Sequence, residues 1–375
     1  MEKKNIDNDI KELKQKINEI KKGREKTLHQ FAKEYKLSTT TFSKSLTKLN
    51  FKIFRTLTLP KLNSKEKDTY SSIYNSISWG GESSMFSSYM ASCTSKGNVY
   101  IYNIKTKSLI HEFNFNNFEL NTVSLEPYEN NLLAAGGFDG GIYVSNLNNS
   151  KHKDSNNESK DHKKFTGHQG VVSCCKFLNT FYLLSASYDS MILLWDINSQ
   201  GKFIHSYHDH TSEVSGLDVN ELNGNIFATG SGDTTAKLWD IREKKACVCT
   251  FKGSETIVSC VKFLPGRYTT LAAGSEDSIV RLYDLRALKE LAAFKKSSND
   301  NNSINSIAFS KSGQILYASS SNSSKIHFWN IFGESSEPFY SYEHKGDTKG
   351  IKQIAMDSTG ANIAYLLDDQ INILQ

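Results

Sequence analysis

Two stretches of the sequence each combine a serine or threonine with histidine, aspartate and tryptophan, a set that could in principle perform nucleophilic catalysis. The first stretch contains His168, Ser185, Ser187, Asp189 and Trp195. The second contains His210, Thr229, Ser231, Asp233 and Trp239. The set recurs with a repeated unit, which is not expected of a catalytic centre. We therefore interpret it as a structural network, in which a buried imidazole links the aspartate to one hydroxyl of each stretch and that hydroxyl links onward to the indole N–H. The hydroxyl is Ser185 or Ser187 in the first stretch and Thr229 or Ser231 in the second.

The spacing of these sets predicts repeated β-sheet units. Most units end in an aromatic residue followed by Asp or Asn, and the closing Asp or Asn residues lie at 103, 146, 196, 240, 284 and 330. Successive positions are 43, 50, 44, 44 and 46 residues apart, a period typical of four-stranded propeller blades. The pattern resembles the WD repeat. We therefore predict an all-β fold, a seven-bladed WD-repeat β-propeller over residues 51–375.

Some segments depart from the regular repeat. The polar segment 148–160 lies within the longest step, and we predict that it is a disordered surface insertion. The seventh unit ends after three strands, so we expect residues 51–60 to supply the outer strand of blade seven and close the ring. Gly253-Ser254 and Asn322-Ser323 replace the histidine of blade five and the turn aspartate of blade six. Those two blades should depend more on packing than on the polar network.

Composition, charge and the absence of certain motifs argue against several classes of function. The chain has no run of eighteen apolar residues, and its six cysteines form no CxxC pair, so we predict a cytoplasmic protein without a metal site or disulfides. It lacks the glycine-rich phosphate-binding motifs, so we predict no cofactor. Residues 1–67 contain 18 Lys and Arg against 8 Asp and Glu, whereas the remainder is acidic overall. This acidic balance argues against nucleic-acid binding by the main body, while the basic leader is either a solvated helix face or attracted to an anionic surface.

Residues 1–50 form a leader with a helical pattern. Its regularly spaced apolar residues are Ile6, Ile10, Leu13, Ile17 and Ile20. Steps of four and three residues predict a heptad seam that binds a coiled-coil partner, thus an N-terminal α-helical coiled-coil extension. A helix lying on a membrane and a helix docked on the propeller are the alternatives. A second helix after Gly23 would extend the contact through Leu28 and Phe31.

From blade three to blade six, the sequence is similar to the β subunits of heterotrimeric G proteins. The similar segments are 165–178, 236–243, 274–287 and 307–313. Adjacent Cys174 and Cys175, and the Tyr-Asp-Leu-Arg sequence at 283–286, are not general features of WD repeats. A short heptad helix followed by seven blades is also the layout of that family. The chain thus resembles a divergent G-protein β subunit.

This resemblance implies a non-enzymatic docking subunit. The leader would pair obligately with a lipidated γ subunit, which would hold the dimer at the inner face of the plasma membrane. One propeller face would bind the GDP-bound α subunit and would signal to effectors after release, with the receptor engaged indirectly. The resemblance places the α-subunit and effector contacts in loops on one rim of the propeller. These contacts are Tyr74, Glu119, Asn121, Phe138, Val171, Glu213, Ser215, Ile257, Ser259, Glu276, Gly350 and Asp368.

Five of these contact positions differ from the family pattern. Glu119 and Asp368 stand where the family has tryptophan, Val171 where it has tyrosine, Ile257 where it has aspartate and Gly350 where it has arginine. Large aromatic residues often anchor protein interfaces. The replacements therefore imply either an α subunit that has changed with this chain or a different set of partners.

Two other function classes remain open from the sequence. One is a general WD-repeat scaffold of the ribosomal or corepressor type, which would not pair with an α subunit. The other is an enzyme with a propeller active site, which would need acids or metal ligands that converge in the central channel. No such group stands out in the sequence.

Overall fold

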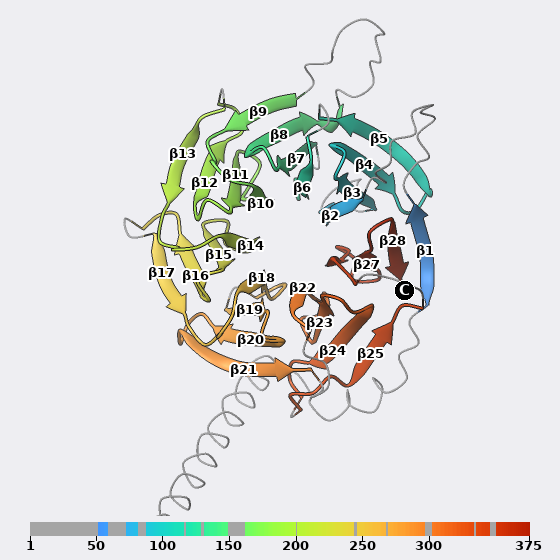
Figure 1. Cartoon of the computed structure of the whole chain (residues 1–375), viewed down its shortest axis with the longest axis vertical. Coiled ribbons are helices and arrows are strands. Elements are labelled where there is room, and N and C mark those ends of the chain that lie inside the picture. Colours follow the sequence, from blue (N-terminus) through green and yellow to red (C-terminus); the bar gives the residue numbers. More distant parts are fainter. Residues whose placement is uncertain are drawn as a thin grey trace, which may run out of the picture.

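The computed structural model describes residues 52–58, 73–81, 88–115, 118–128, 131–148, 162–199, 201–243, 246–267, 269–296, 302–333, 335–345 and 350–375. Within these residues the chain forms seven four-stranded antiparallel sheets arranged in a ring around a central axis (Figure 1). The predicted seven-bladed all-β propeller is therefore confirmed. The predicted leader helix and the insertion at 148–160, apart from Asn148, lie outside the described residues. The described part contains no helix with the length and apolarity needed to span a bilayer.

Each blade is one sheet, with its first strand nearest the axis and its fourth at the periphery. Blade one contains β2 (Tyr74–Trp79), β3 (Tyr89–Thr94), β4 (Asn98–Asn103) and β5 (Ser108–Asn114). Blade two contains β6 (Leu120–Leu125), β7 (Leu132–Gly137), β8 (Gly141–Asn146) and β9 (His162–Thr166). Blade three contains β10 (Val172–Phe177), β11 (Tyr182–Ser187), β12 (Ile192–Asp196) and β13 (Phe203–Tyr207). Blade four contains β14 (Val214–Val219), β15 (Ile226–Ser231), β16 (Ala236–Asp240) and β17 (Cys247–Phe251).

The remaining blades follow the same order except at the closure. Blade five contains β18 (Val258–Phe263), β19 (Thr270–Ser275), β20 (Ile279–Asp284) and β21 (Lys289–Lys295). Blade six contains β22 (Ile304–Phe309), β23 (Ile315–Ser320), β24 (Lys325–Asn330) and β25 (Tyr340–Glu343). Blade seven contains β26 (Gln353–Met356), β27 (Ile363–Leu366), β28 (Gln370–Leu374) and β1 (Ile53–Thr58).

Blade seven joins the two ends of the described chain. The outer strand β1 runs antiparallel to β28, so a strand from the segment 51–60 occupies the outer position of the sheet. A side-chain hydrogen bond from Thr56 Oγ1 to Asn372 Oδ1, 2.6 Å long, adds to the backbone ladder. The pairing completes the fourth strand of blade seven, which lies beside blade one in the ring (Figure 1).

Small residues in the second strands allow neighbouring blades to pack closely. A Cβ atom at Gly230 of β15 would lie 2.7 Å from Val258 Cγ1, and one at Gly274 of β19 would lie 2.7 Å from Ile304 Cγ2. Val258 and Ile304 begin the first strands of the following blades. Glycine at these positions thus lets the next blade approach the sheet without steric conflict. The result is a separate apolar core between each pair of neighbouring blades.

Side chains near the start of the first strands also bind the next blade. At six of the seven blade junctions, such a side chain donates a hydrogen bond to a backbone carbonyl at the start of the following blade. The donor and acceptor pairs are Asn75 and Leu120, Asn121 and Val172, Ser173 and Val214, Ser259 and Ile304, Asn305 and Ile351, and Lys352 and Tyr74. We call this set the channel ring. It fixes the relative positions of the blades around the axis.

Candidate binding surface

One end of the propeller collects two kinds of loop residue from each blade. The residue before a first strand accepts a backbone hydrogen bond from the residue that opens the turn between the second and third strands. The donor and acceptor pairs are Phe138 and Glu119, Tyr188 and Val171, Gly232 and Glu213, and Glu276 and Ile257, at 2.8 to 3.0 Å. We call this end of the propeller, formed by these residues and their counterparts in the other blades, the rim. The turns between first and second strands lie at the opposite end, which we call the far face.

Most of the implied contact positions lie on the rim. The eight rim positions are Glu119, Phe138, Val171, Glu213, Ile257, Glu276, Gly350 and Asp368. Asn121, Ser215 and Ser259 are instead the second residues of first strands, and the side chains of Asn121 and Ser259 belong to the channel ring. These three were expected in loops, and that placement is wrong because the first strands begin one residue before them.

Tyr74 does not fit the role of an exposed contact residue. Its side chain is fully buried, and its hydroxyl group lies 2.9 Å from that of Tyr102 within blade one. Only the backbone reaches the rim, where Tyr74 N–H donates to Asp368 O and Tyr74 O accepts from Lys352 Nζ. Tyr74 is also the first residue of β2, so its expected placement in a loop is wrong.

Exposed aromatic rings gather on the rim over blades two and three. Phe138 is 46% exposed and Tyr188 is 52% exposed, at equivalent turn positions of adjacent blades. Phe118, also exposed, directly precedes Glu119. The family resemblance implied a contact at Phe138 but did not imply one at Phe118 or Tyr188. The sequence does indicate Tyr188, because this large aromatic residue stands between two small polar residues, Ser187 and Asp189.

The Phe118 ring contacts a lysine that is itself bound in an ion pair. Lys164 Nζ lies 5.2 Å from the centre of the Phe118 ring and 5.3 Å from that of Tyr143, within the range of a cation–π contact. The same ammonium lies 2.7 Å from Asp139 Oδ2, which also accepts from the Tyr143 hydroxyl. Burial alone would raise the pKa of Asp139, but these bonds hold it below its ordinary value. Such pre-organisation lowers the entropic cost of binding a partner.

Carboxylates lie on the same rim as the aromatic rings. Glu119 and Glu276 are exposed, and Glu213 is half-buried. The Ser212 hydroxyl donates to Glu213 and lowers the pKa of its carboxyl, so this group stays ionised. Asp368 is bound to Lys352 Nζ at 2.9 Å. The rim over blades two to five therefore offers apolar rings among negative charges, a surface that fits a partner segment with apolar and basic side chains.

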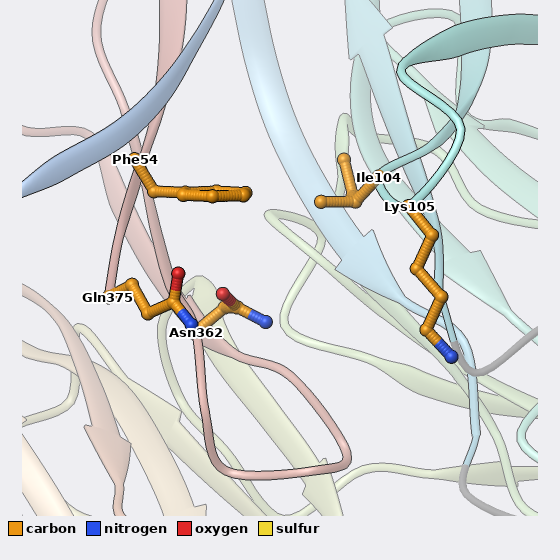
Figure 2. Close-up of a pocket in the computed structure, with 5 residues that line it drawn as sticks. All are labelled: Phe54, Ile104, Lys105, Asn362 and Gln375. Atoms are coloured by element: carbon orange, nitrogen blue, oxygen red, sulfur yellow. The ribbon is translucent and has the colours of Figure 1, made fainter.

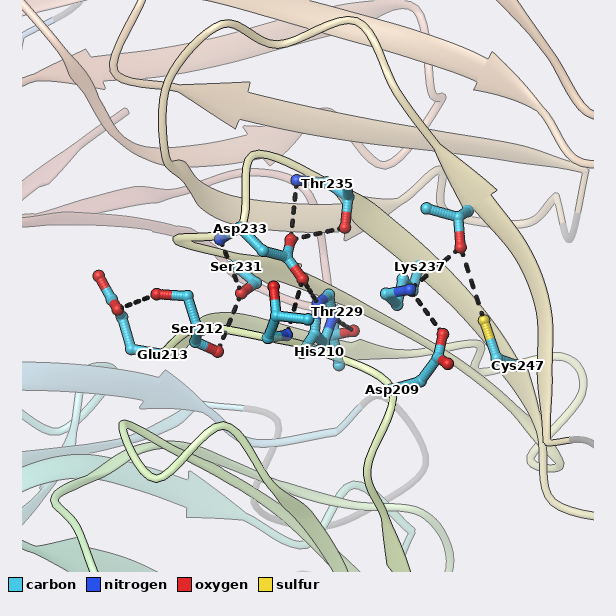
Figure 3. A network of polar contacts seen from close by, with 12 residues as sticks. Asp209, His210, Ser212, Glu213, Thr229, Ser231, Asp233, Thr235, Lys237 and Cys247 are labelled. Carbon is cyan, nitrogen blue, oxygen red and sulfur yellow. Dashed lines mark hydrogen bonds and ion pairs between the residues drawn. The ribbon is translucent and has the colours of Figure 1, made fainter.

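The polar sets found in the sequence form closed networks inside blades three and four. In blade four, His210 Nδ1 lies 2.7 Å from Asp233 Oδ2, and His210 Nε2 lies 2.7 Å from Thr229 Oγ1 (Figure 3). The Trp239 indole N–H donates to the same Thr229 oxygen at 2.8 Å. A tautomer with the proton on Nδ1 satisfies every group. Burial lowers the pKa of His210, which favours this neutral form.

Blade three repeats this arrangement with serine in place of threonine. His168 lies 2.9 Å from Asp189 Oδ2 and 2.7 Å from Ser185 Oγ, and the Trp195 indole N–H donates to Ser185 at 2.8 Å. Between the alternatives left open by the sequence, the hydroxyl group is thus Ser185 rather than Ser187. Burial works against the charge of Asp189, but its hydrogen bonds bring its pKa to about 2.

These networks do not form a catalytic triad. The hydroxyl groups of Ser185 and Thr229 are buried and fully engaged by histidine and tryptophan. A nucleophile must instead reach a substrate. Among the described residues, no group of three or more His, Cys, Asp or Glu side chains is placed to hold a metal ion.

Blade five replaces the histidine network with an ion pair. Arg281 Nη2 lies 2.7 Å from Asp277 Oδ2, and Arg281 Nη1 donates to Ser275 Oγ at 3.0 Å. Burial would raise the pKa of Asp277, but Arg281 holds it below its ordinary value. Blade five was expected to depend more on packing than on the histidine network, and the ion pair adds a polar interaction that this expectation did not include. In blade six the Trp329 indole donates to the backbone oxygen of Ser336 at 3.2 Å, so packing and a backbone bond replace the network.

Comparison with known proteins agrees with this geometry. A model described as WD domain, G-beta repeat, matches residues 159–196, which cover the end of blade two and most of blade three. The matched segment contains all four residues of the blade-three network, His168, Ser185, Asp189 and Trp195. The chain is a WD-repeat β-propeller. A second model, described as nucleolar protein 10-like, N-terminal domain, matches residues 193–358 of the propeller.

Similar curated proteins are named guanine nucleotide-binding protein subunit beta. This chain is 32% identical over 163 residues to the protein of that name from Oryza sativa subsp. japonica and 31% identical to the one from Zea mays. The protein of Oryza sativa subsp. indica is 32% identical over the same length. Each match covers 42% of this chain and 41% of the relative. The propeller thus spans less than half the length of the curated relatives it matches.

Proposed function

We propose that this WD-repeat scaffold is the β subunit of a heterotrimeric G protein, whose rim binds a GDP-bound α subunit and is uncovered when α binds GTP. The rim carries the proposal, because eight positions implied by the family resemblance lie together there. They combine acidic groups such as Glu213 and Glu276 with the exposed ring of Phe138. The similarity to β subunits in two plant species also supports this proposal.

The rim of this chain would bind α with a different set of anchors from those of the family. Phe138, Tyr188 and Phe118 offer large rings over blades two and three, whereas the tryptophan positions of the family hold Glu119 and Asp368. Switching would reside in α, and the channel ring would keep the rim rigid. Effectors would use the same surface once α has left.

A pull-down with the full chain tests this proposal. The chain is immobilised and exposed to α subunits from the native source, loaded either with GDP or with a non-hydrolysable GTP analogue. Retention with GDP alone is expected. Tyr188→Ala and Phe138→Ala should each weaken retention about tenfold or more, as for interface anchors. Phe181→Ala is the matched control, because Phe181 is 58% exposed but lies on the far face.

A second candidate is a scaffold that binds no α subunit. The nucleolar protein 10-like match over residues 193–358 favours it. In that case the retained partners would be the same with either nucleotide, and no α subunit would be among them. That outcome would refute the G-protein proposal.

The proposal also includes a lipidated γ subunit that binds residues 1–50 and holds the complex at the inner face of the plasma membrane. The leader lies outside the described residues, so a coiled-coil partner is argued from the heptad pattern, and the lipidated γ subunit and its membrane attachment are argued from the family resemblance. Leu13→Asp with Ile17→Asp should abolish co-purification of a small helical partner, because the substitutions place charges in the seam. Unchanged co-purification would contradict the coiled-coil assignment.

A further inference from the structure

A crevice on the far face separates blade seven from blade one. It has a volume of about 320 Å³ and is lined by Phe54, Ile104, Lys105, Asn362 and Gln375. Phe54 comes from β1, and Ile104 and Lys105 come from the turn between β4 and β5. Arg55 Nη1 donates to Ile104 O at 2.8 Å and fixes the two sides of the crevice relative to each other. The crevice lies at the opposite end of the propeller from the rim.

The crevice has one apolar level and one polar level. The Phe54 ring and the Ile104 side chain point toward one another across it (Figure 2). Phe54 is 52% exposed, although an aromatic ring of this size normally gains free energy from burial. A large apolar side chain inserted between Phe54 and Ile104 would cover this ring.

The polar level offers amide groups and an ammonium group. Asn362 and Gln375 lie below the Phe54 ring, and Lys105 lies next to Ile104, across the crevice from Phe54 (Figure 2). Asn362 Nδ2 donates to the buried Asp357 at 2.7 Å, which holds the amide in place and leaves its oxygen facing away from that bond. Amides supply both donors and acceptors. They suit a peptide backbone better than a hydrocarbon chain, which would leave them unsatisfied.

The surroundings of the crevice are basic. Lys105 and Lys107 are exposed in the same turn, and Lys52 is exposed beside Gln375, to which it is joined by backbone hydrogen bonds. Further exposed apolar side chains, Leu109 and Ile110, follow on β5. This charge is opposite to that of the rim, so the two ends of the propeller fit partners of opposite sign.

We propose that this crevice is a second docking site, which binds an acidic peptide segment of a partner protein. A large apolar side chain of the segment lies between Phe54 and Ile104. Its flanking carboxylates face Lys105 and Lys107, and its backbone binds the amides of Asn362 and Gln375. This site is independent of α-subunit binding on the rim.

Selection from a random peptide library tests the site with the immobilised full chain. Wild-type protein should enrich peptides with an aromatic or large aliphatic residue next to Asp or Glu. Phe54→Ser should weaken binding of the enriched peptides about tenfold or more, whereas Phe181→Ser, an exposed phenylalanine elsewhere on the far face, should not. Circular dichroism spectra of both variants should match the wild type, because both side chains are largely exposed.

Charge reversal provides the sharper test. The double variant Lys105→Glu and Lys107→Glu should lose the acidic peptides and enrich basic ones at the same site. Failure of wild type to enrich acidic apolar peptides above the Phe54→Ser variant would overturn the proposal. So would stronger binding to vesicles of phosphatidylcholine and phosphatidylserine than to any selected peptide, since that result would assign the basic apolar surface to a membrane.

Discussion

Removing the Thr229 hydroxyl should destabilise the propeller much more than removing a comparable buried hydroxyl that makes no hydrogen bond. Thr229 Oγ1 joins His210 Nε2 at 2.7 Å and the Trp239 indole at 2.8 Å, and it is fully buried. Thr229→Val keeps the shape and leaves two buried polar groups without partners. Each unsatisfied group costs about 1–3 kcal/mol. The expected loss in the free energy of unfolding is therefore about 2–6 kcal/mol.

Thr270→Val is the matched control. Thr270 lies on β19, the second strand of blade five, and is also buried. Within the described residues its hydroxyl oxygen has no hydrogen-bond partner, so the same substitution should change stability by less than about 0.5 kcal/mol or increase it. Urea unfolding of both variants measures the difference. Equal unfolding midpoints would refute the view that the network satisfies buried polar groups.

Two further predictions concern charge. Burial lowers the pKa of His210 in the folded state, so the unfolded chain binds a proton near the ordinary pKa of about 6.5 more readily than the folded chain does. The free energy of unfolding should accordingly fall as the pH drops from about 7.5 to about 5.5, and urea midpoints that do not change over this range would contradict the argument. In blade five, Arg281→Met should lower the free energy of unfolding by about 3–5 kcal/mol, because it leaves the Asp277 carboxylate, whose side chain is only 13% exposed, without its cation. Adding Asp277→Asn should restore much of that loss in the same assay, and no recovery would show that the ion pair is not the cause.

The repeat period and the network residues made most of the architecture predictable. A hydrogen-bonded network needs histidine, hydroxyl, aspartate and tryptophan at fixed places in each blade, so His210 and Trp239 could be assigned from spacing alone. The choice between Thr229 and Ser231 could not be made, because residues two apart on a strand point to the same face. Only the actual distances to His210 decide between them.

The surface was less predictable than the core. Tyr74 was expected in a loop because the family resemblance implies a contact there, but it opens β2, and its side chain lies in the core. Arg281 was not foreseen, because its role depends on reaching Asp277 across a turn after the histidine has been lost from the preceding loop. Phe54 and Ile104 are about fifty residues apart in sequence, so no local pattern could show that they face one another.

The pairing of β1 with β28 has a consequence for how the protein is made. Thr56 and Asn372 are bonded across 316 residues of sequence, so β1 emerges from the ribosome long before its partner exists. At about 5–20 residues per second, the delay is on the order of tens of seconds. During that time the completed blades form an open arc whose end cores face water, and the nascent chain must be protected from aggregation until its last strand arrives.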